Sequence, residues 1–214
     1  MRSRWLQCSA VVMLFVLLSC GGSGKPGTTP QAGAPTESGS QPATSADICN
    51  CSPSAPDSAD YRDLAKHVGL PTATPQDITV AQILQWPTGP DPAPDAPRTG
   101  NELLMFHIPT AYVQFVWLVP NDCDIHMEIS DTPSKTAPRM IVESPIDASY
   151  CPTREAEMAG FARYGAQVST GGFETQQGIP VDVVGLVFRD FLHQRGTKYV
   201  ATPWELHPAI VTVK

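Results

Sequence analysis

The stretch AYVQFVWLVPNDCDIHMEIS, residues 111–130, decides the fold. Residues 111–119 are rich in β-branched and aromatic side chains, which favours a strand. Asn121 and Asp122 are typical turn residues. After the turn, polar and apolar side chains alternate from Asp124 to Ser130. Alternation with a period of two is typical of a half-buried strand, so the stretch predicts two strands joined by a short turn.

The elements that follow complete a mainly β domain with one helix. Pro152 fits the first turn of that helix and Gly165 fits the position after its end. The resulting order β-β-β-α-β-β is that of an OB-fold, a small five-stranded Greek-key barrel. An open α+β sheet with the same order is the alternative, because a sequence pattern does not show whether a sheet closes. The predicted elements are a strand over residues 139–143, a helix over 152–164, a loop over 171–178, and strands over 181–191 and 204–213.

The barrel domain is expected over residues 101–214, which is long enough to bury one hydrophobic core. Residues 47–100 are predicted to be a connecting segment with short helices. One helix is expected over residues 58–68. A second begins with the capping box Thr79-x-x-Gln82. The prolines between residues 88 and 97 then predict extended chain.

Residues 1–19 resemble the signal peptide of a bacterial lipoprotein. Two arginines precede an apolar run over residues 10–18, and residues 17–20 (Leu-Leu-Ser-Cys) have the pattern of a lipobox. The run is shorter than the ~20 apolar residues that a transmembrane helix needs. The resemblance implies cleavage before Cys20 and acylation of Cys20, with palmitate as a typical acyl group, so that the lipid holds the protein to a membrane. An ordinary signal peptide with an incidental cysteine is the alternative.

The residues after the lipobox indicate where the anchored domain stands. Gly21 takes the place of the aspartate that usually retains Gram-negative lipoproteins in the inner membrane. The resemblance therefore implies the outer membrane, where the organism has one. Residues 20–46 consist mainly of Gly, Ser, Thr, Pro, Gln and Ala, the composition of a flexible tether. Such a tether reaches roughly 25–30 Å.

The charge of the chain argues against nucleic acid as a partner. Cleavage would remove two of the 14 basic residues and none of the 21 acidic ones, which leaves a formal charge of −9. Binding to phosphates needs a basic surface. The expected partners are the lipid bilayer, through the acyl groups on Cys20, and an envelope protein or small ligand of unknown identity.

Four cysteines remain after cleavage in addition to Cys20. An even number outside the cytoplasm predicts disulfides, and four cysteines allow three pairings. A zinc site is disfavoured because Cys49-Asn50-Cys51 lacks the spacing of a zinc knuckle. We expect a bond between Cys123 and Cys151. Three states remain open for Cys49 and Cys51: free thiols, a bond to each other, and bonds to other partners.

The sequence lacks the common catalytic motifs, including His-Glu-x-x-His, Gly-x-Ser-x-Gly, the phosphate loop and the dinucleotide fingerprint. Two clusters of carboxylates and imidazoles remain, the residue types of divalent-metal and acid–base sites. The structural interpretation is a solvated polar face for the first and capping hydrogen bonds for the second. The first cluster consists of Asp124, His126 and Glu128, and the second of Asp190, His193, Glu205 and His207.

Four sequence blocks between residues 103 and 213 resemble a family of uncharacterised, often secreted bacterial proteins. The resemblance implies the limits of the domain and no activity. The blocks are Asp-x-Asp-x-His over residues 122–126, Glu-x-Pro over 143–145, Gly-x-x-Phe-x-Asp-x-x-His over 185–193 and Glu-Leu-His-Pro over 205–208.

Two functions fit these observations. The first is a binding or scaffold domain, not an enzyme, which a lipid anchor displays in the cell envelope and for which no cofactor is predicted. The alternative is a metal-dependent hydrolase that uses the second cluster, with Asp124 and His126 nearby. Convergence of His126, His193 and His207 beside a pocket would favour the hydrolase. Positions at separate strand ends would favour the binding domain.

Overall fold

A computed structural model describes residues 45–54, 61–191 and 196–214. The leader, Cys20, the predicted tether up to residue 44, and His193 lie outside the described residues. None of the described helices is long and apolar enough to cross a membrane. In chain order the elements are α1 (Ser45–Asn50), α2 (Asp63–Lys66), β1 (Gln76–Asp77), α3 (Val80–Ile83), η2 (Gly100–Leu103), β2 (Met105–Leu118), β3 (Ile125–Ser130), β4 (Arg139–Ser144), η3 (Ala148–Tyr150), α4 (Cys151–Arg163), β5 (Phe173–Arg189) and β6 (Val200–Val213).

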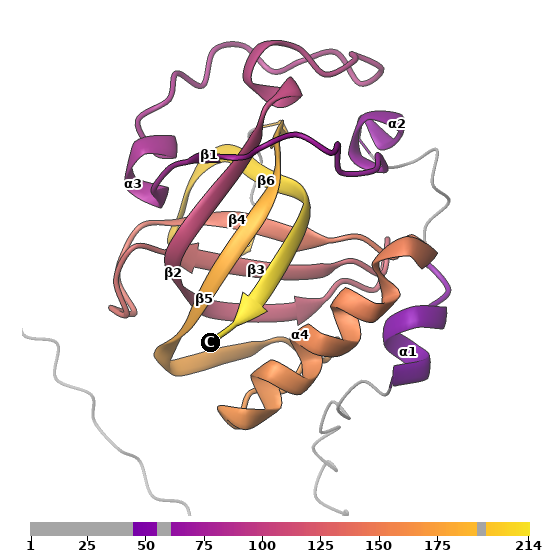
Figure 1. Cartoon of the computed structure of the whole chain (residues 1–214), viewed down its shortest axis with the longest axis vertical. Helices are drawn as coiled ribbons and strands as arrows, with labels where there is room; N and C mark the ends of the chain where they lie inside the picture. The colour runs from indigo at the N-terminus through magenta and orange to yellow at the C-terminus, as the bar shows by residue number, and fades with distance from the viewer. Residues whose placement is uncertain (1–44, 55–60, 192–195) are drawn as a thin grey trace, which may run out of the picture. The chain divides into compact units, whose positions relative to one another are not determined.

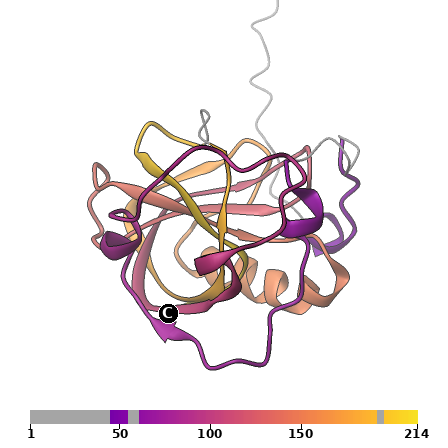
Figure 2. The ribbon, with the colours of Figure 1, turned by 90° about the horizontal axis from the view of Figure 1, so that it is seen from above.

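Five strands close into a barrel, which confirms the OB-like prediction. The sheet order is β1-β2-β3-β4-β6-β5, and β5 pairs again with β2. This second pairing joins the two ends of the sheet, so the open-sheet alternative is wrong. β4 and β6 run parallel, and the other four pairs of the ring are antiparallel. Figure 1 shows β3 and β4 crossing β2, β5 and β6, and Figure 2 shows the ring from above.

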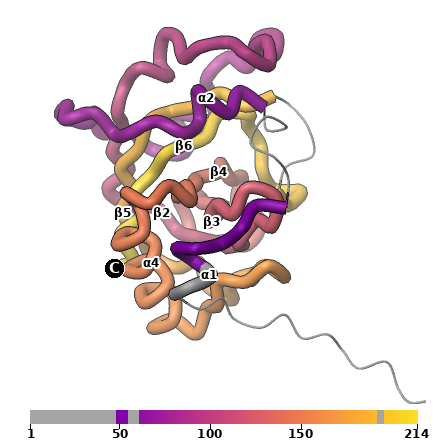
Figure 3. Tube along the Cα trace, turned by 90° about the vertical axis from the view of Figure 1, so that its right-hand side faces the viewer, coloured from indigo at the N-terminus to yellow at the C-terminus, as the bar shows by residue number. Residues whose placement is uncertain are grey.

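The barrel encloses one apolar core, and the segment before residue 101 contributes to it. Ile48 of α1, Val80 and Ile83 of α3, and Ile78 are buried in the same cluster as the inward side chains of the barrel. α1 packs against α4, as Figure 3 shows. Residues 45–54 and 61–100 therefore fold together with the barrel.

Local signals set the ends of the helices. The predicted capping box of α3 is present, with Thr79 Oγ1 accepting from Gln82 N at 3.2 Å and Gln82 Oε1 accepting from Thr79 N at 2.9 Å. Pro152 lies in the first turn of α4, and Gly165 follows its end with φ +69°. A left-handed conformation of this kind favours glycine.

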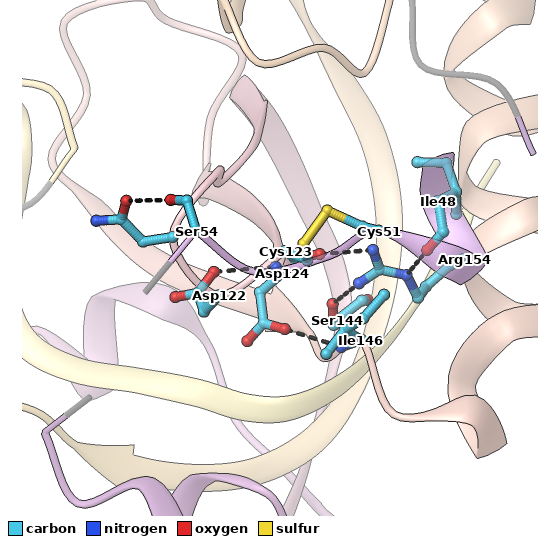
Figure 4. Close-up of a disulfide and its surroundings, with 10 residues drawn as sticks. Ile48, Cys51, Ser54, Asp122, Cys123, Asp124, Ser144, Ile146 and Arg154 are labelled. Carbon is cyan, nitrogen blue, oxygen red and sulfur yellow. Dashed lines mark hydrogen bonds between the residues drawn. A yellow bond between two sulfur atoms is a disulfide. The ribbon is translucent and has the colours of Figure 1, made fainter. Parts of the chain in front are cut away.

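The expected disulfide is wrong. Cys151 bonds to Cys49, and Cys123 bonds to Cys51. The reason is that residues 48–51 run between the start of β3 and the start of α4, where the buried guanidinium of Arg154 holds them. Its Nε donates to Ile48 O at 2.8 Å and its Nη2 donates to Cys123 O at 2.7 Å (Figure 4).

The loop expected over residues 171–178 is mostly strand. β5 begins at Phe173, and Glu174 pairs with Phe115 of β2. The glycines suggested a loop, but Gly178 is needed for close packing. A Cβ there would lie 2.7 Å from Gln114 Nε2 and 2.8 Å from Tyr112 Cβ.

Candidate functional site

The six candidate residues that the structure describes are all buried. Their exposed fractions lie between 0% and 4%. The interpretation of the first cluster as a solvated polar face is therefore wrong, because β3 is buried on both faces. The six residues are Asp124, His126, Glu128, Asp190, Glu205 and His207.

Residues after β5 cover the polar face of β3. The hydroxyl of Thr197 donates to Glu128 Oε2 at 2.6 Å, and the backbone N–H of Thr197 donates to Glu128 Oε1. A Cβ at Gly196 would lie 2.3 Å from Glu128 Oε1 and 3.2 Å from His126 Nε2. This cover comes from about 70 residues further along the chain, so the local pattern of β3 could not reveal it.

Glu143 of β4 joins the two candidate histidines. It is opposite His126 in the β3–β4 register, and its neighbours on β4 pair with β6 beside His207. Its Oε1 lies 2.8 Å from His126 Nδ1, and its Oε2 lies 2.9 Å from His207 Nδ1. Because a carboxylate only accepts hydrogen bonds, each Nδ1 carries the proton.

Two further carboxyl groups lie beside the other ring nitrogens of the two histidines. His207 Nε2 lies 3.4 Å from Asp124 Oδ2, and His126 Nε2 lies 4.0 Å from Glu128 Oε1. Neither Nε2 atom has a hydrogen-bond partner among the described residues. Asp124, His207, Glu143, His126 and Glu128 therefore form a buried row of alternating acids and imidazoles. We call these five residues the acid–imidazole row.

The surrounding carboxylates favour charged imidazoles. Burial opposes the charge on His207, but its contacts with Glu143, Glu205 and Asp124 outweigh burial and raise its pKa to about 10. Burial likewise opposes the charge on His126, but Glu128 and Glu143 raise its pKa to about 9. A protonated imidazole cannot act as a general base at neutral pH. In this charge state neither imidazole can accept a proton from a substrate.

The pKa values of the two carboxyl groups beside His207 are shifted in opposite directions. Burial raises the pKa of Asp124 to about 7, although the charge of His207 opposes that change. The pKa of Glu143 lies well below its usual value. Burial alone would raise this pKa, but the hydrogen bonds from His126 and His207 outweigh burial. Glu143 is therefore the fixed negative charge at the centre of the row.

The second predicted cluster is only partly described, because His193 lies outside the described residues. Asp190 lies 3.8 Å from Lys66 of α2, and Glu205 lies 3.6 Å from His207 Nδ1. His207 instead joins the residues of the first cluster through Glu143. Glu143 is not among the site residues predicted from the sequence, although it begins the Glu-x-Pro block.

A separate groove of about 810 Å³ lies beside α2. Two leucines stand exposed in it, Leu64 at 90% and Leu103 at 63%. None of the described candidate residues lines it. The remaining lining residues are Arg62, Asp63, Ala65, Val68, Pro94, Asp95, Ala96, Pro97 and Arg98.

Phe188 of β5 contacts both residues that line the groove and the ring of His207. The guanidinium groups of Arg62 and Arg98 lie 4.7 and 5.2 Å from its ring centroid. The ring centroids of Phe188 and His207 lie 6.2 Å apart, and Arg98 Nη2 donates to the backbone oxygen of His207. Phe188 belongs to the Gly-x-x-Phe block of the sequence, for which no role was predicted.

No family model, curated protein or solved structure matches the chain. The resemblances to bacterial lipoproteins and to an uncharacterised bacterial family therefore stay predictions.

Proposed function

We propose that this chain is a lipid-anchored protein of the bacterial cell envelope, in the outer membrane where the organism has one. Its OB-like barrel is a binding domain for an apolar segment of another envelope protein. The observation that carries the binding role is the groove beside α2, with Leu64 and Leu103 exposed. The lipobox at residues 17–20 and the tether support the anchor. The two disulfides agree with a location outside the reducing cytoplasm.

The form of the groove favours a protein partner over an enclosed small molecule. Leu64 is 90% exposed, so its side chain projects from α2 and contributes little to a cavity wall. Exposed leucines beside an apolar surface are a feature of protein contacts. Proline and alanine residues of the 94–97 segment line the groove and supply further apolar surface.

The hydrolase alternative has less support. The imidazoles of His126 and His207 are buried and are held by Glu143. The groove is lined by other residues. Arg98, which lines the groove, contacts His207 at its backbone oxygen and not at its ring.

The anchor is tested by replacing the acylated cysteine. Cys20→Ser should abolish labelling of the protein by radioactive palmitate and release it from the membrane fraction, because the thiol is the attachment point of the lipid. Cys8→Ser is the matched control, since Cys8 lies in the leader. Membrane association and normal cleavage in Cys20→Ser would refute the anchor.

The binding surface is tested by photo-crosslinking in living cells of the native host. A benzophenone amino acid at position 64 should give one discrete protein adduct. Leu103→Asp should remove this adduct, because a charge at the rim disfavours apolar contact. The same amino acid at Tyr164, which is 46% exposed outside the groove, is the control.

Three outcomes contradict the groove proposal. They are the absence of an adduct at position 64, an equal adduct from Tyr164, and an adduct that persists in a folded Leu103→Asp variant. An adduct of small-molecule mass at position 64 would replace the protein partner with a small ligand.

A further inference from the structure

Two atoms at one end of the acid–imidazole row, His207 Nε2 and Asp124 Oδ2, have a spacing that suits a cation bound to both. His207 Nε2 and Asp124 Oδ2 are buried and 3.4 Å apart. His207 Nε2 has no hydrogen-bond partner among the described residues. Donor atoms of Asp124, Glu143 and His207 lie within 4.8 Å of one another. The arrangement combines a buried nitrogen without a partner with two carboxylates.

We infer that Asp124 and His207 bind a divalent transition-metal cation of the Zn²⁺ class, with Glu143 orienting His207. In a tetrahedral site with bonds of ~2.0–2.1 Å, two ligand atoms are about 3.4 Å apart. The 3.4 Å between Asp124 Oδ2 and His207 Nε2 equals this distance between ligand atoms. An imidazole with a carboxylate selects this class over Mg²⁺ or Ca²⁺, which prefer oxygen ligands alone.

Both ligands are already held in the orientation that binding requires. The backbone N–H of Ile146 donates to Asp124 Oδ1 at 2.8 Å, a bond drawn in Figure 4, and this leaves Oδ2 for the cation. Glu143 Oε2 accepts from His207 Nδ1 at 2.9 Å. A carboxylate behind a metal-bound histidine is the usual second layer of such sites, because it fixes the ring and the tautomer.

The charges of the site suit a divalent cation. Asp124 and Glu143 supply two carboxyl groups, one near each nitrogen of the His207 ring. The other carboxylate of the row, Glu128, has its own cation, because Arg139 Nη1 lies 2.9 Å from its Oε2. Lys66 of α2 lies 3.8 Å from Asp190, and its charge also acts on Glu143.

The site lies one side chain away from solvent. The ring of His67 in the C-cap of α2 packs edge-on against that of His207, with centroids 5.9 Å apart. The side chain of His67 is 24% exposed. We expect water from the side of His67 to fill the remaining coordination positions. This inference stands independently of the proposed anchor and partner.

The test uses the full chain as it is purified from cells in detergent. After incubation with Zn²⁺ or Co²⁺ and removal of unbound ion, elemental analysis should find about one ion per chain, and Co²⁺ should give the intense visible absorption of tetrahedral coordination. Asp124→Asn and His207→Gln should each weaken binding more than about tenfold. Melting curves establish whether each variant is folded.

His107→Gln is the matched control. His107 also lies between two carboxylates, but both of its ring nitrogens are engaged, Nδ1 with Asp77 at 2.8 Å and Nε2 with Asp182 at 3.1 Å. Its substitution should leave binding unchanged. Absence of a bound ion in the parent, unchanged affinity in folded Asp124→Asn, or loss of binding in folded His107→Gln would overturn the inference.

A measurement on the parent alone covers the case in which the buried variants do not fold. X-ray absorption at the zinc edge should show one imidazole and otherwise oxygen ligands. A sulfur ligand, or no imidazole, would place the ion elsewhere and sink the inference.

Discussion

Glu157 of α4 is a carboxyl group enclosed by protein. Its Oε1 accepts from Ser144 Oγ at 2.7 Å and from Val211 N at 3.0 Å, and Oε2 has no hydrogen-bond partner among the described residues. Burial raises its pKa from 4.5 to about 7, although the two hydrogen bonds oppose the change. The folded protein therefore keeps a proton that the unfolded chain releases.

The pH dependence of stability follows from this difference. The free energy of unfolding should be highest below pH 4.5, fall as the pH rises to about 7, and then stay level with respect to this group. Glu157→Gln keeps the shape and removes the titration. Between pH 4 and pH 8 the variant should therefore gain about 2–3 kcal/mol relative to the parent.

Urea unfolding of both proteins at pH 4, 6 and 8 measures the effect. Glu155→Gln, two residues earlier on the exposed side of α4, is the control and should follow the parent. Parallel pH profiles for the parent and Glu157→Gln would show that Glu157 is ionised in the folded protein.

At the residue scale, the sequence pattern indicates most of the acid–imidazole row but not its central residue, Glu143. Asp124, His126 and Glu128 share a strand, so their spacing alone groups them. His207 joins them only through Glu143, and that contact depends on how β4 pairs with both β3 and β6. The pairing of distant strands is set by barrel closure, which a local pattern does not contain.

The two disulfides connect α1 and the residues that follow it to the barrel. Cys49 and Cys51 are separated by one residue, yet they bond to partners 102 and 72 positions away. With the Cys49–Cys151 bond intact, the second bond closes a loop of only about 30 residues, because the shorter path runs through the first bond. Removing Cys51–Cys123 alone should therefore cost about 3–4 kcal/mol in the chain-entropy account.

The variant for this measurement is Cys51→Ala/Cys123→Ala, compared with the parent by urea unfolding under oxidising conditions. Peptide mapping of the parent would join three peptides, because Cys49 and Cys51 lie on one. In Cys49→Ala/Cys151→Ala, the bond between Cys51 and Cys123 should remain. Two free thiols in that variant would contradict the pairing.

At the scale of the molecule, the sequence predicted the barrel because strand periodicity and element order are local signals. It did not predict how the segment before residue 101 packs. Ile48 and Ile83 enter the core from this segment. The groove is formed by α2 and residues 94–98, which come together only in the folded chain. Surfaces made from separate segments leave no periodic signal.

The position of β6 also determines when the barrel can form. It is the last of the five barrel strands in the chain, yet it lies between β4 and β5 and provides the parallel pairing with β4. Until β6 is available, β4 and β5 each have an unpaired edge, and such edges promote association with other chains. Folding therefore cannot proceed stepwise along the chain. We expect the barrel to close only when β6 pairs with β4, and the high sequence separation of the β4–β6 contacts predicts slow folding.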